Sequence, residues 1–290
     1  MIYKRCIFLG GGGGQNCVVF LPLFSNQIGR LELHTLFTSK ATALTLPSPK
    51  TRLQVQPHTL ATPVSMGKTV AVVAAHADDE ALGCGGTIAR HVAQGDTVHL
   101  VLIADGVTSR LPVDDGDADR RMAALKAAQH VLGIESVTPL CLPDNQMDSL
   151  PLLEIVQRLT PVLARLRPHV VYTHHHGDLN VDHRLTHEAV MTACRPVPGA
   201  SVTEIYGFEV LSSTEWATPH KTQFVPTMFV DVSDQVATKM QALEAYFEEM
   251  RPEPHSRSMH HVKVLAQHRG CSVGVDAAEA FEVYRVVRSM

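Results

Sequence analysis

Residues 69–80 read TVAVVAAHADDE, an apolar run that ends abruptly in a polar cluster. The run has the length and the unbroken apolar character of a parallel strand that is buried on both faces. The acidic residues directly after it suit the first turn of a helix, which we predict over residues 79–94 with Gly95 as its end. The segment therefore predicts a βα unit with polar side chains at the carboxyl end of its strand.

The same alternation of strand and helix patterns continues along the chain. We predict further strands over residues 97–104, 136–142, 169–173, 203–210 and 227–232. Helices are predicted over residues 117–132, 150–166, 182–194 and 233–249, the last one capped by Ser233, and shorter helices over the tail 256–288. Repeated βα units indicate an α/β fold in three layers, with a mainly parallel sheet covered on both faces by helices. Ligands bind such sheets beyond the carboxyl ends of the strands.

Residues 1–65 have a different character, with a glycine run and Thr-, Ser- and Pro-containing segments that lack periodicity. We predict a disordered extension or a start assigned too early, which leaves residues 66–290 as the folded domain. Lys4 and Arg5 precede an apolar segment as in a signal peptide, but five glycines and Gln15-Asn16 interrupt it. Secretion is therefore not favoured.

The composition excludes several classes of function. The net charge of −4 comes without a basic stripe, which argues against a nucleic-acid partner. No segment has the ~18 consecutive apolar residues that span a membrane. The six cysteines include no CxxC pair, so neither a zinc ribbon nor a disulfide framework is indicated. We expect a cytoplasmic protein with reduced thiols, and a homo-oligomer stays open.

The first polar cluster has the composition of a metal site. Adjacent carboxylates at positions 78–80 repel one another unless a cation or a helix N-terminus offsets them. A helix N-terminus accounts for one or two of them, but it does not account for the histidine that precedes them. A divalent metal accounts for both the histidine and the carboxylates. His76 and Asp79 would converge on the ion, and Asp78 would lie beside it to accept the proton of an attacking water.

The second polar cluster, HHHGDLNVDHR at residues 174–184, follows the predicted strand 169–173. His183 would sit in the first turn of the next helix, where it can turn back toward the strand ends as a third ligand. Three protein ligands with one open position are typical of catalytic zinc, so we expect one Zn²⁺ per chain. Asp182 either caps this helix or orients a metal-binding imidazole. His187 is interpreted as structural.

Together the two clusters resemble the motifs of the LmbE-like, or PIG-L, deacetylases. AHADDEALGCGGT resembles the family's AHPDDE motif, and the Asp-His-Arg element follows about 100 residues later, with the resemblance extending from about Met66 to Arg285. The resemblance implies a Rossmann-like fold, zinc bound by His76, Asp79 and His183, and Asp78 as general base. It also implies hydrolysis of the N-acetyl group of an N-acetylglucosamine-type amino sugar.

Two positions depart from the family pattern. Ala77 stands where the family has Pro, and Asn180 replaces the first His of the HPDH element, which assists the tetrahedral intermediate. An Asn can donate a hydrogen bond to an oxyanion, but it cannot act as a general acid. The candidates for that role are His255 in PEPHSRS, which a neighbouring subunit could supply, and then His176. For substrate contacts we predict Asp105, Arg110 and Asp178.

Two alternative functions remain at this point. A metal-dependent phosphoesterase predicts a second metal ~3.5–4 Å from the first and phosphate-binding Arg or Lys. The motif loops carry only Arg184. A catalytically silent metal-binding protein is the other alternative, because the HPDH histidine is missing.

Overall fold

A computed structural model describes residues 67–106 and 116–288 of the chain. The predicted extension over residues 1–65 and the predicted substrate contact Arg110 lie outside these ranges. The described residues form a seven-stranded sheet in the order β3-β2-β1-β4-β5-β7-β6. Its strands are β1 (Thr69–Ala74), β2 (Thr97–Ala104), β3 (Ser136–Leu142), β4 (Val170–His174), β5 (Glu204–Phe208), β6 (Met228–Asp231) and β7 (Ala278–Val286).

The sheet is mainly parallel, as predicted. Strands β1 to β5 pair in parallel, and β7 alone runs antiparallel to its neighbours β5 and β6. The helices are α1 (Asp79–Ala93), α2 (Asp117–Leu132), α3 (Leu152–Leu166), α4 (Val181–Ala193), α5 (Val236–Ala245) and α6 (Met259–Val273), with two 3₁₀ turns at Met147–Ser149 and Thr214–Trp216.

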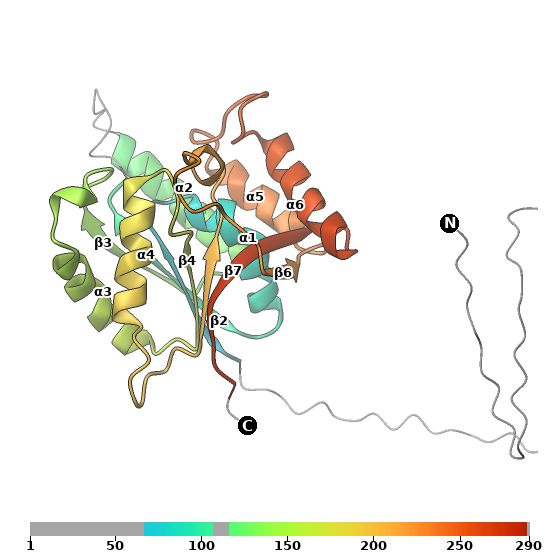
Figure 1. The fold of residues 1–290 in the computed structure, drawn as a ribbon. Coiled ribbons are helices and arrows are strands. Elements are labelled where there is room, and N and C mark those ends of the chain that lie inside the picture. The colour runs from blue at the N-terminus through green and yellow to red at the C-terminus, as the bar shows by residue number, and fades with distance from the viewer. Residues whose placement is uncertain (1–66, 107–115, 289–290) are drawn as a thin grey trace, which may run out of the picture. The chain divides into compact units, whose positions relative to one another are not determined.

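Helices cover both faces of the sheet because alternate side chains of each inner strand face opposite cores. On β1, Val70 and Val72 belong to a core that includes buried residues of α1, α2 and α5. Ala71 and Val73 belong to a second core with α3 and α4. The three-layer α/β fold predicted from the sequence is therefore confirmed (Figure 1).

Strand β1 marks the point where the strand order reverses. It pairs with β2 on one side and with β4 on the other, so the connections after β1 and β4 leave in opposite directions. Such a reversal opens a crevice at the carboxyl ends of the two strands, where ligands bind in open α/β sheets. The two polar clusters follow these same two strands.

Helix α1 is broken inside the domain, and a buried ion pair compensates for the break. Cys84 has non-helical dihedrals, which frees backbone groups on both sides of it. The Glu279 carboxylate accepts from the backbone N–H of Gly86 and Thr87 at 2.9 and 2.7 Å. Lys239 donates to the carbonyl of Leu82 at 2.8 Å and to Glu279 at 2.6 Å. Side chains from α5 and β7 thus form hydrogen bonds with the backbone groups that the break leaves free.

Two predicted elements differ from the structure. The tail does not consist of short helices: after α6, residues Ala278–Val286 form β7, inserted between β5 and β6. Ala and Glu in AEAFEVYRV favour a helix locally, but two neighbouring strands offer this segment hydrogen-bond partners on both sides. The helix predicted from Ser233 is α5, which begins at Val236. The Ser233 hydroxyl donates to Asp231 and does not cap it.

Among the residues described, none of the helices combines the length and the apolar character needed to cross a bilayer.

Candidate metal centre

The turn between β1 and α1 brings two polar side chains together. Asp78 adopts a left-handed backbone conformation with φ of 113°, which is rare for a residue other than glycine and marks a strained turn. Asp79 then begins the helix, and its Oδ2 accepts from the backbone N–H of His76 at 2.8 Å. The strained residue therefore lies between the two side chains predicted to bind the metal.

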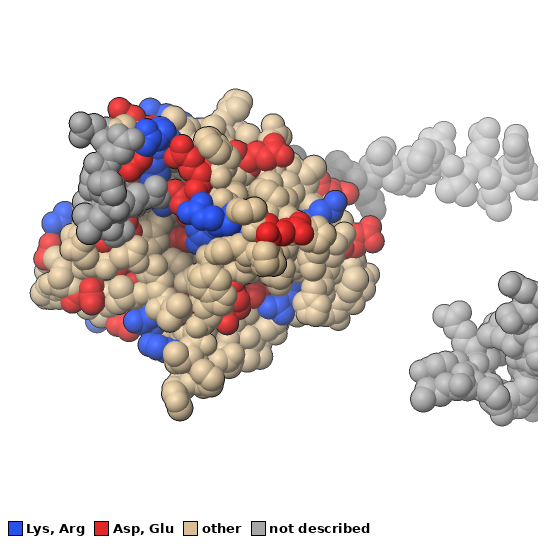
Figure 2. Space-filling view, turned by 90° about the horizontal axis from the view of Figure 1, so that it is seen from above, with Lys and Arg blue, Asp and Glu red and all other residues tan. Residues whose placement is uncertain are grey.

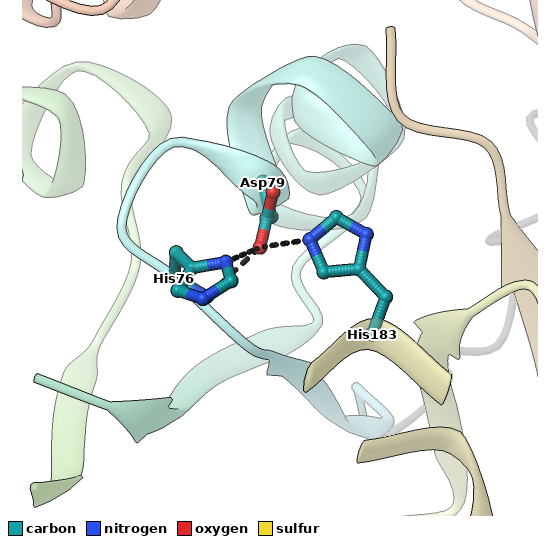
Figure 3. Close-up of side chains that lie close together, drawn as sticks. All are labelled: His76, Asp79 and His183. Atoms are coloured by element: carbon teal, nitrogen blue, oxygen red, sulfur yellow. Dashed lines mark hydrogen bonds and ion pairs between the residues drawn. The ribbon is translucent and has the colours of Figure 1, made fainter. Parts of the chain in front are cut away.

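The three predicted ligands meet at one point. Nδ1 of His76 and Nε2 of His183 lie 3.3 and 3.4 Å from the same oxygen, Oδ2 of Asp79. One ligand atom from each residue lies within 4.8 Å of the others (Figure 3). Ligands 2.0–2.2 Å from a tetrahedral zinc ion are separated by roughly 3.4 Å. The donor atoms and their spacing therefore fit zinc.

Each of the two imidazoles also contacts a buried carboxylate through its second ring nitrogen, the one that faces away from Asp79. Nε2 of His76 lies 3.1 Å from Oδ2 of Asp182, and Nδ1 of His183 lies 3.2 Å from Oδ1 of Asp178. A carboxylate on the second ring nitrogen is the usual support of a metal-binding histidine. Of the two roles considered for Asp182, the contact with an imidazole is present. The side chain that caps α4 belongs to Asn180, which accepts from the backbone N–H of Asp182 at 2.8 Å.

A further aspartate, outside the residues predicted for the site, lies beside these ligands. Oδ1 of Asp144, after β3, lies 3.1 Å from Nε2 of His76. His76, Asp144 and Asp182 form a second group of potential ligands. However, the Asp182 oxygens already accept from the backbone N–H of Asn145 and Met147 at 2.6 and 3.1 Å. We therefore interpret this group as hydrogen-bonded support for His76.

The charges around the ligands shift their pKa values. Burial lowers the pKa of His183, but Asp79 and Asp178 raise it further, to about 9. Burial likewise acts to lower the pKa of His76, but contacts with Asp144, Asp182 and Asp79 hold it well above its usual value. In the metal-free protein a proton therefore competes with a cation for these nitrogens.

A cavity of about 190 Å³ opens beside the three ligands. Seen from the carboxyl end of the parallel strands, acidic and basic side chains lie together around a hollow in the surface (Figure 2). Its lining comes from the segments that follow β1, β2, β3 and β4, from helix α2 and from two later loops. It consists of His76, Asp78, Asp79, Gly106, Arg121, Asp144, Asn145, Asn180, His183, Ser212, Ser213, Glu249 and Arg257.

Asp78 faces this cavity between two arginines. Arg257 Nη1 donates to its Oδ2 at 2.8 Å. Burial raises the pKa of Asp78, and the nearby Arg257 and Arg121 counteract that rise. Arg121 is held by the carbonyl of Ala77 at 3.0 Å and by Glu249 at 2.8 Å. Neither arginine was predicted, although the PEPHSRS segment that carries Arg257 was singled out for another residue.

The two histidines proposed as general acid are not among the residues lining the cavity. Nδ1 of His255 accepts from the backbone N–H of Arg257 at 3.0 Å, and its ring packs edge-on against Trp216. Nδ1 of His176 lies 3.3 Å from the Tyr284 hydroxyl. Asn180, by contrast, lines the cavity, and its side chain donates to Asn145 at 2.9 Å.

The predicted substrate contacts occupy other positions. Asp178 is fully buried behind His183, and its carboxylate accepts from the hydroxyls of Ser213 and Thr214. Asp105 follows β2, with its backbone N–H on the carbonyl of Leu142 at 2.9 Å, and does not line the cavity. His187, interpreted as structural, bonds the carbonyl of His174 at 3.1 Å.

Sequence comparison relates the chain to deacetylases. A family model described as "GlcNAc-PI de-N-acetylase" (PIG-L) matches residues 71–194. The "Uncharacterized deacetylase YaiS" of Escherichia coli (strain K12) is 29% identical over 185 residues, 62% of this chain and 90% of that protein. The "1D-myo-inositol 2-acetamido-2-deoxy-alpha-D-glucopyranoside deacetylase" of Mycobacterium sp. (strain KMS) is 30% identical over 221 residues, 60% of this chain and 71% of that protein.

Structure comparison shows the same fold in proteins of different activity. The conserved protein TT1542 from Thermus thermophilus aligns with a TM-score of 0.62 and 24% identity over 77% of this chain and 97% of that one. N,N'-diacetylchitobiose deacetylase from Pyrococcus horikoshii aligns with a TM-score of 0.60 and 20% identity, over 75% of this chain and 84% of that one. GalB, a 4-carboxy-2-hydroxymuconate hydratase from Pseudomonas putida KT2440, aligns with a TM-score of 0.61 and 22% identity, over 77% of this chain and 99% of that one. These likenesses identify the fold alone.

Proposed function

The chain belongs to the PIG-L (LmbE-like) family of deacetylases, and we propose that it uses one zinc ion to hydrolyse the N-acetyl group of an N-acetylglucosamine-type amino sugar. The observation that carries the proposal is the convergence of His76, Asp79 and His183 beside a cavity that Asp78 also faces. Zinc held there would act as a Lewis acid on the amide and would lower the pKa of a bound water toward about 7.

Asp78 is the proposed base. Its carboxylate faces the cavity next to the ligand Asp79, and the Arg257 guanidinium holds one of its oxygens at 2.8 Å. In this position it accepts the proton of the water that attacks the amide carbon. The arginine contacts Oδ2, and we assign the second oxygen to that water.

We also assign the return of the proton to Asp78. The leaving amine needs a proton as the C–N bond breaks, and His255 and His176 do not line the cavity. Burial raises the pKa of Asp78, which favours its protonated form as the donor to this nitrogen. One group then serves first as base and afterwards as acid, and both products, acetate and the free amine, leave without help from either histidine.

Two hydrogen-bond donors are available for the developing oxyanion. Asn180 lines the cavity with an amide group that now donates to Asn145, and Arg257 carries further N–H groups. Loss of one donor in comparable acyl-transfer sites costs about 2.7–4 kcal/mol of transition-state stabilisation. Asp178, expected earlier to bind substrate, instead receives a supporting role as the carboxylate behind His183.

The amino-sugar substrate is inferred from the relatives. The Mycobacterium protein is named as a deacetylase of an acetamido-glucopyranoside, and a diacetylchitobiose deacetylase of Thermococcus kodakarensis is 25% identical over 197 residues, 62% of this chain and 69% of that protein. A cytoplasmic location is also part of the proposal. It is supported by the four cysteines of the described residues, none of which is in a disulfide.

The test is acetate release from a panel of N-acetylglucosamine conjugates, with p-nitrophenyl phosphate as the phosphoesterase substrate. Asp78→Asn removes the base and keeps the size of the side chain, so we expect a loss of about 10²–10⁴-fold in kcat. Asp276→Asn, at an exposed aspartate, is the matched control and should keep wild-type activity. Full activity in Asp78→Asn would remove Asp78 from the mechanism. Phosphate release without acetate release would favour the phosphoesterase.

Metal analysis separates the enzyme from a silent metal-binding protein. We expect the wild type to need zinc for acetate release and His183→Ala to lose both the ion of this site and the activity. An intact zinc site with no acetate release from any conjugate would support the silent alternative.

A further inference from the structure

A second group of histidines lies on the far side of β4 from the site described above. His175 and His176 follow β4, and Glu282 lies on β7, with β5 between the two strands (Figure 1). Gly207 of β5 pairs with Thr173 of β4 and with Glu282 of β7. A Cβ on this glycine would lie 2.5 Å from the Tyr284 ring, so its absence leaves room for β7 side chains to reach the histidines.

Three ligand atoms converge there. Nδ1 of His175 lies 2.7 Å and Nδ1 of His176 lies 3.7 Å from the same oxygen, Oε2 of Glu282. One ligand atom from each of the three residues lies within 4.8 Å of the others. We propose that these residues form a second site for a zinc-class divalent cation, separate from the His76–Asp79–His183 site.

The surroundings support ligation through these atoms. Nε2 of His175 lies 2.8 Å from the carbonyl oxygen of Thr222, so it carries the hydrogen and Nδ1 is left as the ligand nitrogen. The Tyr284 hydroxyl donates to Oε2 of Glu282 at 2.8 Å, as a supporting bond to a ligating carboxylate. Its oxygen also lies 3.3 Å from Nδ1 of His176, so ligation through this nitrogen requires that the ring proton of His176 move to Nε2. Two imidazoles and a carboxylate suit Zn²⁺ and Co²⁺ better than Ca²⁺ or Mg²⁺, which prefer oxygen ligands.

The geometry requires only small movements. Around a tetrahedral ion the ligand atoms stand roughly 3.4 Å apart, so the His175 nitrogen and the Glu282 oxygen would separate by roughly 0.7 Å, and the His176 nitrogen would approach that oxygen by roughly 0.3 Å. His175 and Glu282 are buried, whereas the His176 side chain is 40% exposed. An ion can therefore enter from the His176 side, with solvent in the fourth position.

A buried ion pair between His175 and Glu282 would explain their short contact without a metal. That pair does not need His176, which lies 3.7 Å from the carboxylate, whereas a metal site needs it as a ligand. Substitution of His176 therefore distinguishes the two explanations. Since His176 is half exposed, His176→Ala leaves the buried pair and the fold intact.

The experiment is a titration of the tag-free, metal-free chain with Co²⁺ and then with Zn²⁺. Stoichiometry is measured by elemental analysis, and Co²⁺ coordination by its visible absorption. We expect two equivalents in the wild type and one in His176→Ala, and the equivalent that remains should be lost in the His176→Ala/His183→Ala double variant. His260→Ala, at an exposed histidine of α6, is the matched control and should bind two.

One equivalent in the wild type, or two in His176→Ala, would overturn the second site. Glu282→Gln, which keeps the size of the side chain and removes the charge, should also lose one equivalent. Binding is measured without substrate, so failure of acetate release would contradict the proposed function and leave this site standing.

Discussion

Nη1 of Arg257 lies 2.8 Å from Oδ2 of Asp78, although the two residues are 179 positions apart in the sequence. Nε of the same guanidinium donates to the Ser212 hydroxyl at 3.0 Å, which fixes the orientation of its planar group. A guanidinium stays charged throughout the physiological pH range, so it opposes the rise in the pKa of Asp78 that burial causes. The loop before α6 thereby contributes directly to the cavity.

Replacement of this arginine should slow the reaction and shift its pH dependence. In Arg257→Gln the pKa of Asp78 rises because its cationic partner is gone, so the acid limb of kcat/KM moves to higher pH. We expect kcat/KM to fall by about 10²-fold near pH 7. Arg257→Lys keeps the charge and should recover part of the loss. Arg251→Gln, at an exposed arginine of the same loop, is the control. An unchanged pH profile in Arg257→Gln would contradict this role.

The carboxylate behind His183 should control metal affinity. Asp178→Asn removes the negative charge that lies 3.2 Å from Nδ1 of the ligand, and keeps hydrogen-bonding atoms near Ser213 and Thr214. Changes of this kind typically weaken metal binding by about 10–100-fold. Competition with a chromophoric chelator measures the effect, and Asp276→Asn serves as the reference. Wild-type affinity in Asp178→Asn would mean that His183 needs no support.

The raised pKa of His183 predicts opposite pH trends for folding and for metal binding. In the metal-free protein its pKa is about 9, because Asp79 and Asp178 outweigh the lowering by burial. The unfolded value is about 6.5, so the added stability is complete below that pH and is lost as the pH rises through about 9. The total is roughly 3 kcal/mol, since each unit of pKa corresponds to about 1.4 kcal/mol.

Urea unfolding of metal-free wild type and His183→Gln should therefore converge between about pH 6.5 and 9. Over the same range zinc affinity should increase by at least about tenfold per pH unit, because each bound ion displaces a proton. A constant difference between wild type and His183→Gln would show that this histidine is not stabilised by its carboxylates.

The stability of the domain should depend on both charges of the buried ion pair at the break in α1. Lys239 and Glu279 are both buried, and Glu279→Gln leaves the ammonium without its counter-charge. Removal of one partner from such a pair costs about 3–5 kcal/mol. The double variant Lys239→Met/Glu279→Gln should be less destabilised than the single one, as measured by urea midpoints. Equal loss in both would show that the charge of Lys239 is not the cause.

The proposed ligands that lie together in the structure are residues that follow buried strands. His76, Asp79 and His183 come shortly after buried strands, and parallel strands end at the same edge of a sheet, so sequence alone brings them near one another. The same reasoning applied to β3 would have selected Asp144 and Asn145, which follow its carboxyl end in CLPDNQ.

Other contributions had no comparable signal. Arg257 lies in a loop without periodicity, and only the packing of that loop against the β1–α1 turn brings it to Asp78. Asp178 and Asn180 share one polar segment, yet one is buried behind a ligand and the other faces the cavity. The backbone conformation of the turn determines which of the two side chains faces the cavity, and the residue types alone do not predict that conformation. The strand β7 was missed because its partners, and not its composition, determine its conformation.

The position of β7 has a consequence for how the domain is made. The ribosome synthesises β7 after every other described element. The strand nevertheless lies between β5 and β6, which are made before it, and β6 is joined to the described sheet by its pairing with β7. Until it arrives, β5 and β6 present unpaired backbone edges, which are prone to association with other chains. The nascent domain is therefore most vulnerable to aggregation after β6 is made and before β7 has paired, and helper proteins that shield strand edges would act in that interval.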